Sequence, residues 1–217
     1  MPPKIKALVF DFGGVISKTL FETHASTERR LSLPPGSLTW RGPFANGDDT
    51  LWEAMQRREI SERDYWRTRA KEVGAMVGQD WTSMMEFVQT ARGTADPGEW
   101  VRPEALDVIA HAKAAGLRLA ILSNELDLFY GADFSKNLPL LQDFEVVIDA
   151  TYTKILKPDP RAFELVGQAL DLSLTDCLFI DDQLKNIEGA QALNMPFVHF
   201  DVTNPAGSYL EVRKTYV

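Results

Sequence analysis

A short buried strand that ends in an aspartate and two glycines constrains the fold of this chain more than any other feature. The stretch from Ile5 to Phe10 is mostly apolar and rich in strand-favouring residues, and it stops at Asp11. Gly13 and Gly14 then allow a sharp turn and a close approach of the backbone to a ligand. Ligands of open α/β sheets bind at the carboxyl ends of the strands. Asp11 is therefore a candidate site residue, although an aspartate after a strand can also simply stabilise a turn.

Further strands alternate with helical segments along the second half of the chain. The predicted strands are residues 117–122, 145–148, 177–180 and 198–200. Pro103 is expected to begin a helix that carries Leu106, Ile109, Ala110 and Ala114 on one face, and Asp159 is expected to cap another. This alternation predicts an α/β fold, a doubly wound parallel sheet with helices on both faces.

Residues 18–92 carry few strand signals and many helical ones. One amphipathic helix is expected in DDTLWEAMQRREI, with Asp48 or Asp49 near its start. Ser61 is expected to cap a second helix and Asp80 a third. The sequence therefore predicts a core domain of residues 1–17 and 93–217, an inserted α-helical domain of residues 18–92, and a linker at residues 92–98.

Composition excludes several classes of function. The 217 residues are 45% hydrophobic and 25% charged, as in a globular protein with a proper core. The net charge of −8 argues against nucleic acid and against an anionic membrane surface as partners, and no stretch is long enough to span a membrane. The single cysteine, Cys177, fits a reducing compartment, so we expect a cytoplasmic protein. The oligomeric state cannot be read from the sequence.

Polar residues end four of the predicted strands or the loops that follow them. These residues are Asp11, Ser123 with Asn124, Lys157, and Asp181 with Asp182. Because the carboxyl ends of parallel strands lie on one edge of the sheet, we expect these side chains to gather there.

The expected cluster suits phosphoryl transfer. Three carboxylates, Asp11, Asp181 and Asp182, lie together at high cost unless one is protonated or a cation sits among them, and oxygen ligands suit Mg²⁺. Ser123, Asn124 and Lys157 add donors for an anion, and Gly14 is a candidate for binding the substrate. We therefore expect a small phosphorylated molecule as substrate.

Four motifs resemble those of the haloacid dehalogenase-like hydrolases, in the same order. They are VFDFGGV around Asp11, ILSNE around Ser123, KPDP from Lys157, and FIDDQLKNIEGA around Asp181 and Asp182. The resemblance covers essentially the whole chain and implies a Rossmann-like core with an α-helical cap at residues 18–92. The NIEGA and VRPEAL segments are most similar to the branch that contains α-D-glucose-1-phosphate phosphatases and the phosphatase domain of soluble epoxide hydrolases.

The resemblance implies a role for each matching residue. Asp11 is implied as the nucleophile that becomes an aspartyl-phosphate, and as a ligand of Mg²⁺. The backbone carbonyl of Gly13 and the carboxylate of Asp182 are implied as further ligands, with Asp181 behind them. Ser123, Asn124 and Lys157 are implied to hold the phosphoryl oxygens. Asn186 either positions the metal-site loop or lies on a helix face.

Gly13 departs from the pattern of the family. Most phosphatases of the superfamily carry an aspartate at this position as general acid and base, a role typically worth about 10²–10⁴-fold in rate. Substrates with a good leaving group, such as sugar-1-phosphates, would tolerate its loss, or Glu125, Asp127 or His24 could supply the proton. The alternatives are a 2-haloacid dehalogenase, with Arg41 or a neighbouring arginine holding the substrate carboxylate, and a catalytically weak phosphate-binding module.

Overall fold

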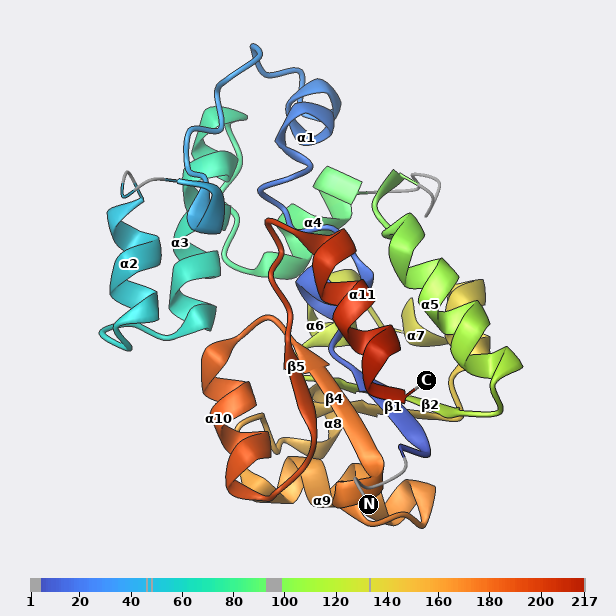
Figure 1. Cartoon of the computed structure of the whole chain (residues 1–217). Helices are drawn as coiled ribbons and strands as arrows, with labels where there is room; N and C mark the ends of the chain where they lie inside the picture. Colours follow the sequence, from blue (N-terminus) through green and yellow to red (C-terminus); the bar gives the residue numbers. More distant parts are fainter. Residues whose placement is uncertain (1–4, 46, 48, 93–98, 133, 217) are drawn as a thin grey trace. The chain divides into compact units, whose positions relative to one another are not determined.

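A parallel five-stranded sheet organises the chain in a computed structural model, which describes residues 5–45, 47, 49–92, 99–132 and 134–216 (Figure 1). The strand order is β3-β2-β1-β4-β5, and every neighbouring pair is parallel. The strands are β1 (Ala7–Phe10), β2 (Arg118–Ser123), β3 (Val146–Asp149), β4 (Cys177–Asp181) and β5 (Phe197–His199). The strand that ends at Asp11 is thus the central one, as a buried apolar strand should be.

Helices fill most of the remaining described chain. They are α1 (His24–Arg30), α2 (Thr50–Gln56), α3 (Glu62–Met76), α4 (Met84–Arg92), α5 (Pro103–Ala114), α6 (Leu126–Tyr130), α7 (Phe134–Asn137), α8 (Ala150–Thr153), α9 (Pro160–Leu170), α10 (Leu184–Ala192) and α11 (Pro205–Tyr216). Among the described residues, no helix has the length and the apolar character that crossing a membrane requires.

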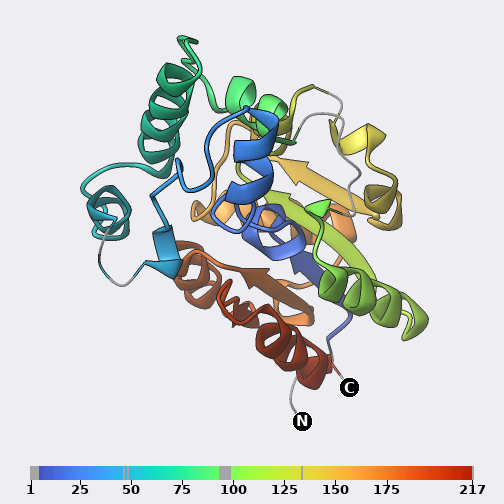
Figure 2. The same ribbon diagram turned by 90° about the horizontal axis from the view of Figure 1, so that it is seen from above.

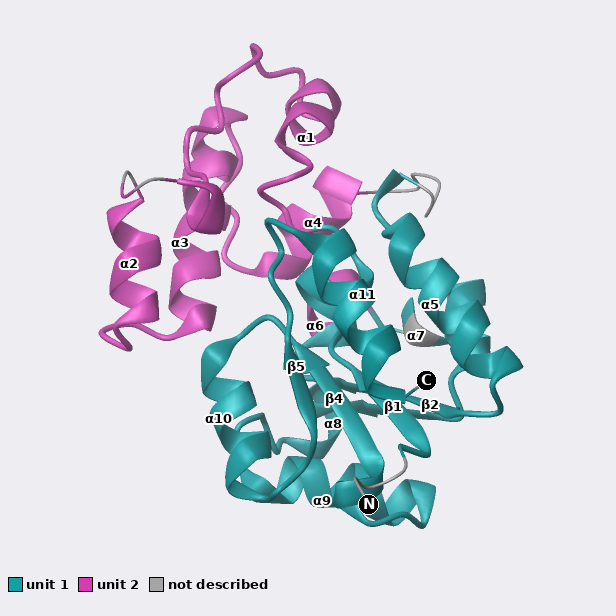
Figure 3. Cartoon of the chain, viewed as in Figure 1, with its two compact units in different colours: residues 1–18, 97–127, 132–217 teal, residues 19–96, 128–131 magenta. Residues whose placement is uncertain are grey.

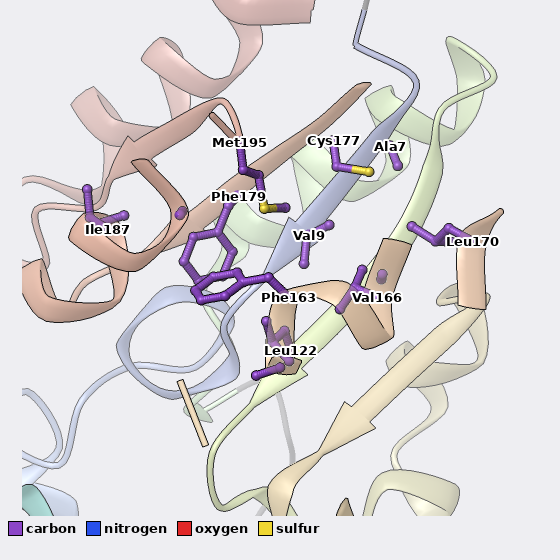
Figure 4. Close-up of a cluster of buried hydrophobic side chains, with 13 residues drawn as sticks. Ala7, Val9, Leu122, Phe163, Val166, Leu170, Cys177, Phe179, Ile187 and Met195 are labelled. Atoms are coloured by element: carbon purple, nitrogen blue, oxygen red, sulfur yellow. The ribbon is translucent and has the colours of Figure 1, made fainter. Parts of the chain in front are cut away.

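The helices of the second half cover both faces of the sheet. On one face, α9 and α10 pack on alternate strand residues, and Val9, Leu122 and Phe179 meet Phe163 and Val166 in a buried apolar cluster (Figure 4). On the other face, α5 and α11 lie beside each other (Figure 2). The prediction of a doubly wound α/β fold is therefore confirmed.

The chain divides into two compact units (Figure 3). We call residues 1–18, 97–127 and 132–217 the sheet unit, and residues 19–96 and 128–131 the helical unit. The helical unit has its own core of aromatic rings from α3 and the preceding loops, in which the Phe21 ring packs edge to face on Trp40 and tilted against Tyr65. The domain boundaries expected from the sequence stay a prediction, and residues 128–131 were not expected to group with the helical segment.

Several predicted helix starts are confirmed by their hydrogen bonds. Asp49 caps α2 by accepting from the Trp52 backbone N–H, and Ser61 caps α3 in the same way. Asp159 caps α9, in which Pro160 is the first residue. Asp48 and linker residues 93–98 lie outside the described residues.

Two predictions about helices are wrong. Asp80 does not cap α4, because Ser83 and Glu86 form a capping box there and the helix begins only at Met84. Leu106 does not face the core but is 43% exposed. The buried stripe of α5 is Ala105, Val108, Ile109 and Ala112, so the helix is rotated from the face that the sequence suggested.

Candidate active site

The loop after β1 forms a tight turn around Gly13 and Gly14. The Ser17 backbone N–H donates to the carbonyl of Phe12 at 2.9 Å and closes the turn. Gly14 has a φ of +77°, and a Cβ added there would lie 2.9 Å from Oδ2 of Asp182. A glycine is therefore needed at this position, both for its backbone conformation and for its close approach to a carboxylate. The turn brings the loop that follows Asp11 directly against the loop that follows β4.

Three carboxylates gather at this edge of the sheet. Asp11, Asp181 and Asp182 each offer an oxygen, and these oxygens all lie within 4.8 Å of one another. Asp181 is fully buried and well supplied with donors: Lys157 Nζ at 2.7 Å, Asn186 Nδ2 at 3.1 Å and the Gln183 backbone N–H at 2.8 Å. Asp182 is only half-buried, and its Oδ2 accepts from the Gln183 side chain at 3.2 Å. The two adjacent aspartates therefore sit in different environments.

The buried Lys157 forms ion pairs with two of the carboxylates. Its Nζ lies 2.9 Å from Oδ1 of Asp11 and 2.7 Å from Oδ2 of Asp181. Burial alone would lower the pKa of Lys157, but the two carboxylates outweigh it and raise the pKa, so the ammonium stays charged. Burial raises the pKa of Asp11 to about 7, and Lys157 opposes that rise while Asp181 adds to it. A cation beside Asp11 would favour its carboxylate form.

The side chain of Asn124 is engaged by the backbone of Lys157. Its Oδ1 accepts from the Lys157 backbone N–H at 2.7 Å, and its Nδ2 donates to the Lys157 carbonyl at 3.2 Å. Ser123, the last residue of β2, is buried beside it. The expectation that the Asn124 side chain binds phosphoryl oxygens stays untested, but its contacts fit the positioning of Lys157.

Asp149 is a buried residue that was not predicted from the sequence as part of the site. It ends β3 and accepts from the backbone N–H groups of Leu126, Asp127 and Thr151 at 3.2, 2.8 and 2.8 Å. It thereby fixes the segment that follows Ser123 and Asn124. The same sequence pattern that identifies Asp11 and Asp181 could have identified it, because Asp149 is also an aspartate at the end of an apolar strand.

The three candidates for a replacement proton donor differ in their surroundings. Asp127 is buried and accepts from the Tyr152 hydroxyl at 2.6 Å, which suits a structural role. Glu125 is buried just beyond Asn124. His24 belongs to the helical unit, where its ring lies 4.2 Å from that of Trp40, and burial lowers its pKa to about 4. His24 is therefore neutral near pH 7.

The residues at the edge of the sheet fit a divalent metal ion. Carboxylate oxygens of Asp11 and Asp182 lie within 4.8 Å of each other, a side chain on Gly14 would crowd Asp182, and hard oxygen ligands are those that Mg²⁺ prefers. Asn186, for which the sequence left two roles open, donates to both oxygens of Asp181 at 3.1 Å and thus holds that carboxylate in place.

Solved structures share this fold. An L-2-haloacid dehalogenase from Xanthobacter autotrophicus is 20% identical, with a TM-score of 0.60 over 90% of this chain and 77% of the other. A protein from Bacteroides thetaiotaomicron described as a HAD family enzyme, solved with magnesium and inorganic phosphate, is 19% identical, with a TM-score of 0.54 over 91% of this chain and 95% of the other. At these identities the likeness concerns the fold alone.

Curated relatives are similar at the level of sequence. A phosphatase of Mycobacterium tuberculosis is 29% identical over 88% of this chain and 85% of its own length. A mouse protein named acyl-CoA dehydrogenase family member 10 is 27% identical over 95% of this chain, which spans only 19% of that protein. A (S)-2-haloacid dehalogenase from a Pseudomonas species is 32% identical over 49% of this chain and 47% of its own length.

The sequence pattern of one family runs through nearly the whole chain. The pattern described as haloacid dehalogenase-like hydrolase matches residues 5–194, which include the helical unit, most of the sheet unit and all the strand-end residues described above. The match agrees with the four motifs, with the parallel sheet and with the relatives named as phosphatases. The chain belongs to the haloacid dehalogenase-like hydrolases and is an enzyme of the hydrolase type.

Proposed function

We propose that this protein is a Mg²⁺-dependent phosphomonoesterase that acts on a small phosphorylated molecule. The observation that carries the proposal is the cluster of Asp11, Asp181 and Asp182, in which Lys157 lies between the first two. Asp182, which is less buried than Asp181, would hold the cation together with one oxygen of Asp11 and the backbone carbonyl of Gly13. Bound Mg²⁺ would supply positive charge to the oxygens of the phosphoryl group.

Asp11 is the proposed nucleophile. One of its carboxylate oxygens forms a bond to phosphorus while the bond from phosphorus to the alcohol oxygen breaks, which gives an aspartyl-phosphate and the free alcohol once that oxygen has gained a proton. Water then attacks the phosphorus, releases phosphate and restores Asp11. Lys157 orients Asp11 through the 2.9 Å contact to Oδ1 and adds positive charge where the phosphoryl oxygens lie.

Gly13 shapes the proposed substrate preference. With no carboxyl group at this position, the departing oxygen receives little help from a general acid, so esters with good leaving groups should react fastest. Sugar-1-phosphates, acyl phosphates and aryl phosphates have such leaving groups, whereas sugar-6-phosphates do not. This preference agrees with the glucose-1-phosphatase branch that the NIEGA and VRPEAL segments resemble.

A 2-haloacid dehalogenase is the second candidate, because a relative with that activity is 32% identical over half of the chain. Such an enzyme displaces halide from carbon with the same aspartate and needs no cation. The buried Asp181 beside the half-buried Asp182 argues against it, because adjacent carboxylates beside Asp11 have a clear use only around a metal ion.

The test is release of phosphate from para-nitrophenyl phosphate and from sugar-1- and sugar-6-phosphates, with Mg²⁺ and with a chelator. Mg²⁺-dependent turnover that is lost in Asp11→Asn would support the proposal. Chloride release from 2-chloropropionate in the presence of the chelator would instead identify the dehalogenase. Equal rates on the two classes of sugar phosphate would contradict the proposed preference but not the phosphatase itself.

A further inference from the structure

Three consecutive carbonyls of the loop after β1 accept hydrogen bonds from residues far away in the sequence. Arg102 Nε donates to the carbonyl of Gly14 at 3.0 Å, and the Tyr209 hydroxyl donates to the carbonyl of Val15 at 2.9 Å. The backbone N–H of Arg102 donates to the carbonyl of Ile16, also at 2.9 Å. These three hydrogen bonds therefore hold the backbone of the loop that carries the proposed metal ligand Gly13.

The ring of Phe200 contacts both Arg102 and Tyr209. The guanidinium carbon of Arg102 lies 5.7 Å from the centre of the Phe200 ring, and that ring packs edge to face on Tyr209 at 4.9 Å. We call Arg102, Phe200 and Tyr209 the loop brace. They come from the start of α5, from the segment after β5 and from α11, and each is at most 2% exposed.

The contacts of Arg102 exceed what packing alone requires. Burying a guanidinium is costly unless its N–H groups find partners, so an apolar side chain would fill this space more cheaply if filling space were the only need. Arg102 instead directs Nε to the carbonyl of Gly14, the residue at which an added Cβ would meet the carboxylate of Asp182. A rotation of the peptide after Gly14 would disturb that contact and with it the neighbouring peptide of Gly13.

We propose that the loop brace holds the loop after Asp11 in the conformation that binds the divalent cation. Arg102 and Tyr209 are then positioning residues that act through the backbone of residues 13–16 and touch neither substrate nor metal. The inference rests on the proposed Mg²⁺ site, and it adds residues whose effect on that site is measurable without turnover.

The test measures Mg²⁺ binding alone, by titration calorimetry, and checks it by electron paramagnetic resonance with Mn²⁺. Removing residues that orient metal ligands typically costs about 10–100-fold in metal affinity or activity. We therefore expect Arg102→Met to bind Mg²⁺ about 10–100-fold more weakly than the wild type, and Tyr209→Phe to lose less, because it deletes a single hydroxyl and keeps the ring. Arg102→Lys, which can still donate to Gly14, should recover part of the affinity.

Val212→Ala is the matched control. Val212 is fully buried on the same helix, close to Tyr209 in sequence, so its truncation loosens the packing of α11 without removing a donor to the loop. This variant should bind Mg²⁺ as the wild type does. Should Arg102→Met fail to fold, the comparison of Tyr209→Phe with Val212→Ala still decides the question.

The outcomes separate this inference from the proposed function. Unchanged Mg²⁺ affinity in both Arg102→Met and Tyr209→Phe would overturn the loop brace and leave the phosphatase proposal standing. A wild-type protein that binds Mg²⁺ but hydrolyses no phosphate ester would contradict the phosphatase while the variants still test the brace. A wild-type protein that binds no Mg²⁺ would overturn both.

Discussion

Replacing Gly13 by aspartate is expected to convert the protein into a faster phosphatase for poor leaving groups. Gly13 has φ −70° and ψ 127°, a conformation open to any residue, and a Cβ built on it meets no atom within 4 Å. Gly13→Asp therefore introduces no backbone strain and no clash. The change in stability should stay within about 1 kcal/mol, because a side chain that fits also reduces the freedom of the unfolded chain.

The expected gain in rate follows from general acid catalysis. A positioned carboxyl group that protonates a departing alkoxide contributes typically about 10²–10⁴-fold, which corresponds to roughly 3–5 kcal/mol of activation free energy. Esters of alkyl alcohols should gain by this amount. Esters of nitrophenol should gain far less, because their oxygen leaves readily without a proton.

The assay compares kcat/KM for para-nitrophenyl phosphate and for a primary alkyl phosphate in wild type, Gly13→Asp and Gly13→Asn. The asparagine variant matches the aspartate in size but cannot deliver a proton, so it should behave as the wild type. An equal gain on both esters, or an asparagine variant as fast as the aspartate variant, would refute the reasoning. So would the absence of any gain on the alkyl ester.

Three further predictions follow from contacts in the two units. Gly14→Ala should weaken Mg²⁺ binding and lower the free energy of unfolding by about 1–3 kcal/mol. Gly116, at a φ of +75° with open space where a Cβ would lie, is the control, because Gly116→Ala should lower the stability but leave Mg²⁺ binding unchanged. Mg²⁺ titration and urea unfolding measure the two effects. Asn124→Ala should lower kcat and cost about 1–3 kcal/mol of stability by unpairing the Lys157 backbone N–H; an unchanged kcat would contradict the positioning role. Because burial lowers the pKa of His24 from 6.5 to about 4, the unfolded chain takes up a proton first as pH falls. Stability should therefore decline by up to about 3 kcal/mol between pH 6.5 and 4, and that part of the decline should vanish in His24→Gln when unfolding is followed by tryptophan fluorescence.

The strand-end residues could be predicted because each is marked locally. Asp11, Ser123 and Asp181 all follow an apolar run that stops abruptly, and the parallel topology brings such ends to one edge. The structure places Asp11, Asp181, Asp182 and Lys157 together as expected. The predicted strand 145–148 ends one residue before Asp149, which is the last residue of β3.

Helix faces were harder to predict than helix starts. A cap is decided within a few residues, so Ser61 and Asp159 were found from their own neighbourhood. The buried face of α5 is decided by β2 and α11, which lie beyond the reach of local spacing. Leu106 fits the helical period as well as Ala105 does, and only the packing of small residues against the sheet explains why the leucine is the exposed one.

The role of the loop brace cannot be predicted from the local sequence, because its residues act through backbone atoms of distant segments. Arg102 lies in the VRPEAL segment as the residue before a helix-starting proline, and Tyr209 lies in none of the four motifs. Their partners, Gly14 and Val15, are 88 and 194 positions away. A carbonyl accepts equally well from any side chain with a suitable donor, so the identity of the loop residues does not specify their partners. The residues at the strand ends can therefore be predicted from the sequence, whereas the residues that hold their backbone in place can be identified only from the three-dimensional structure.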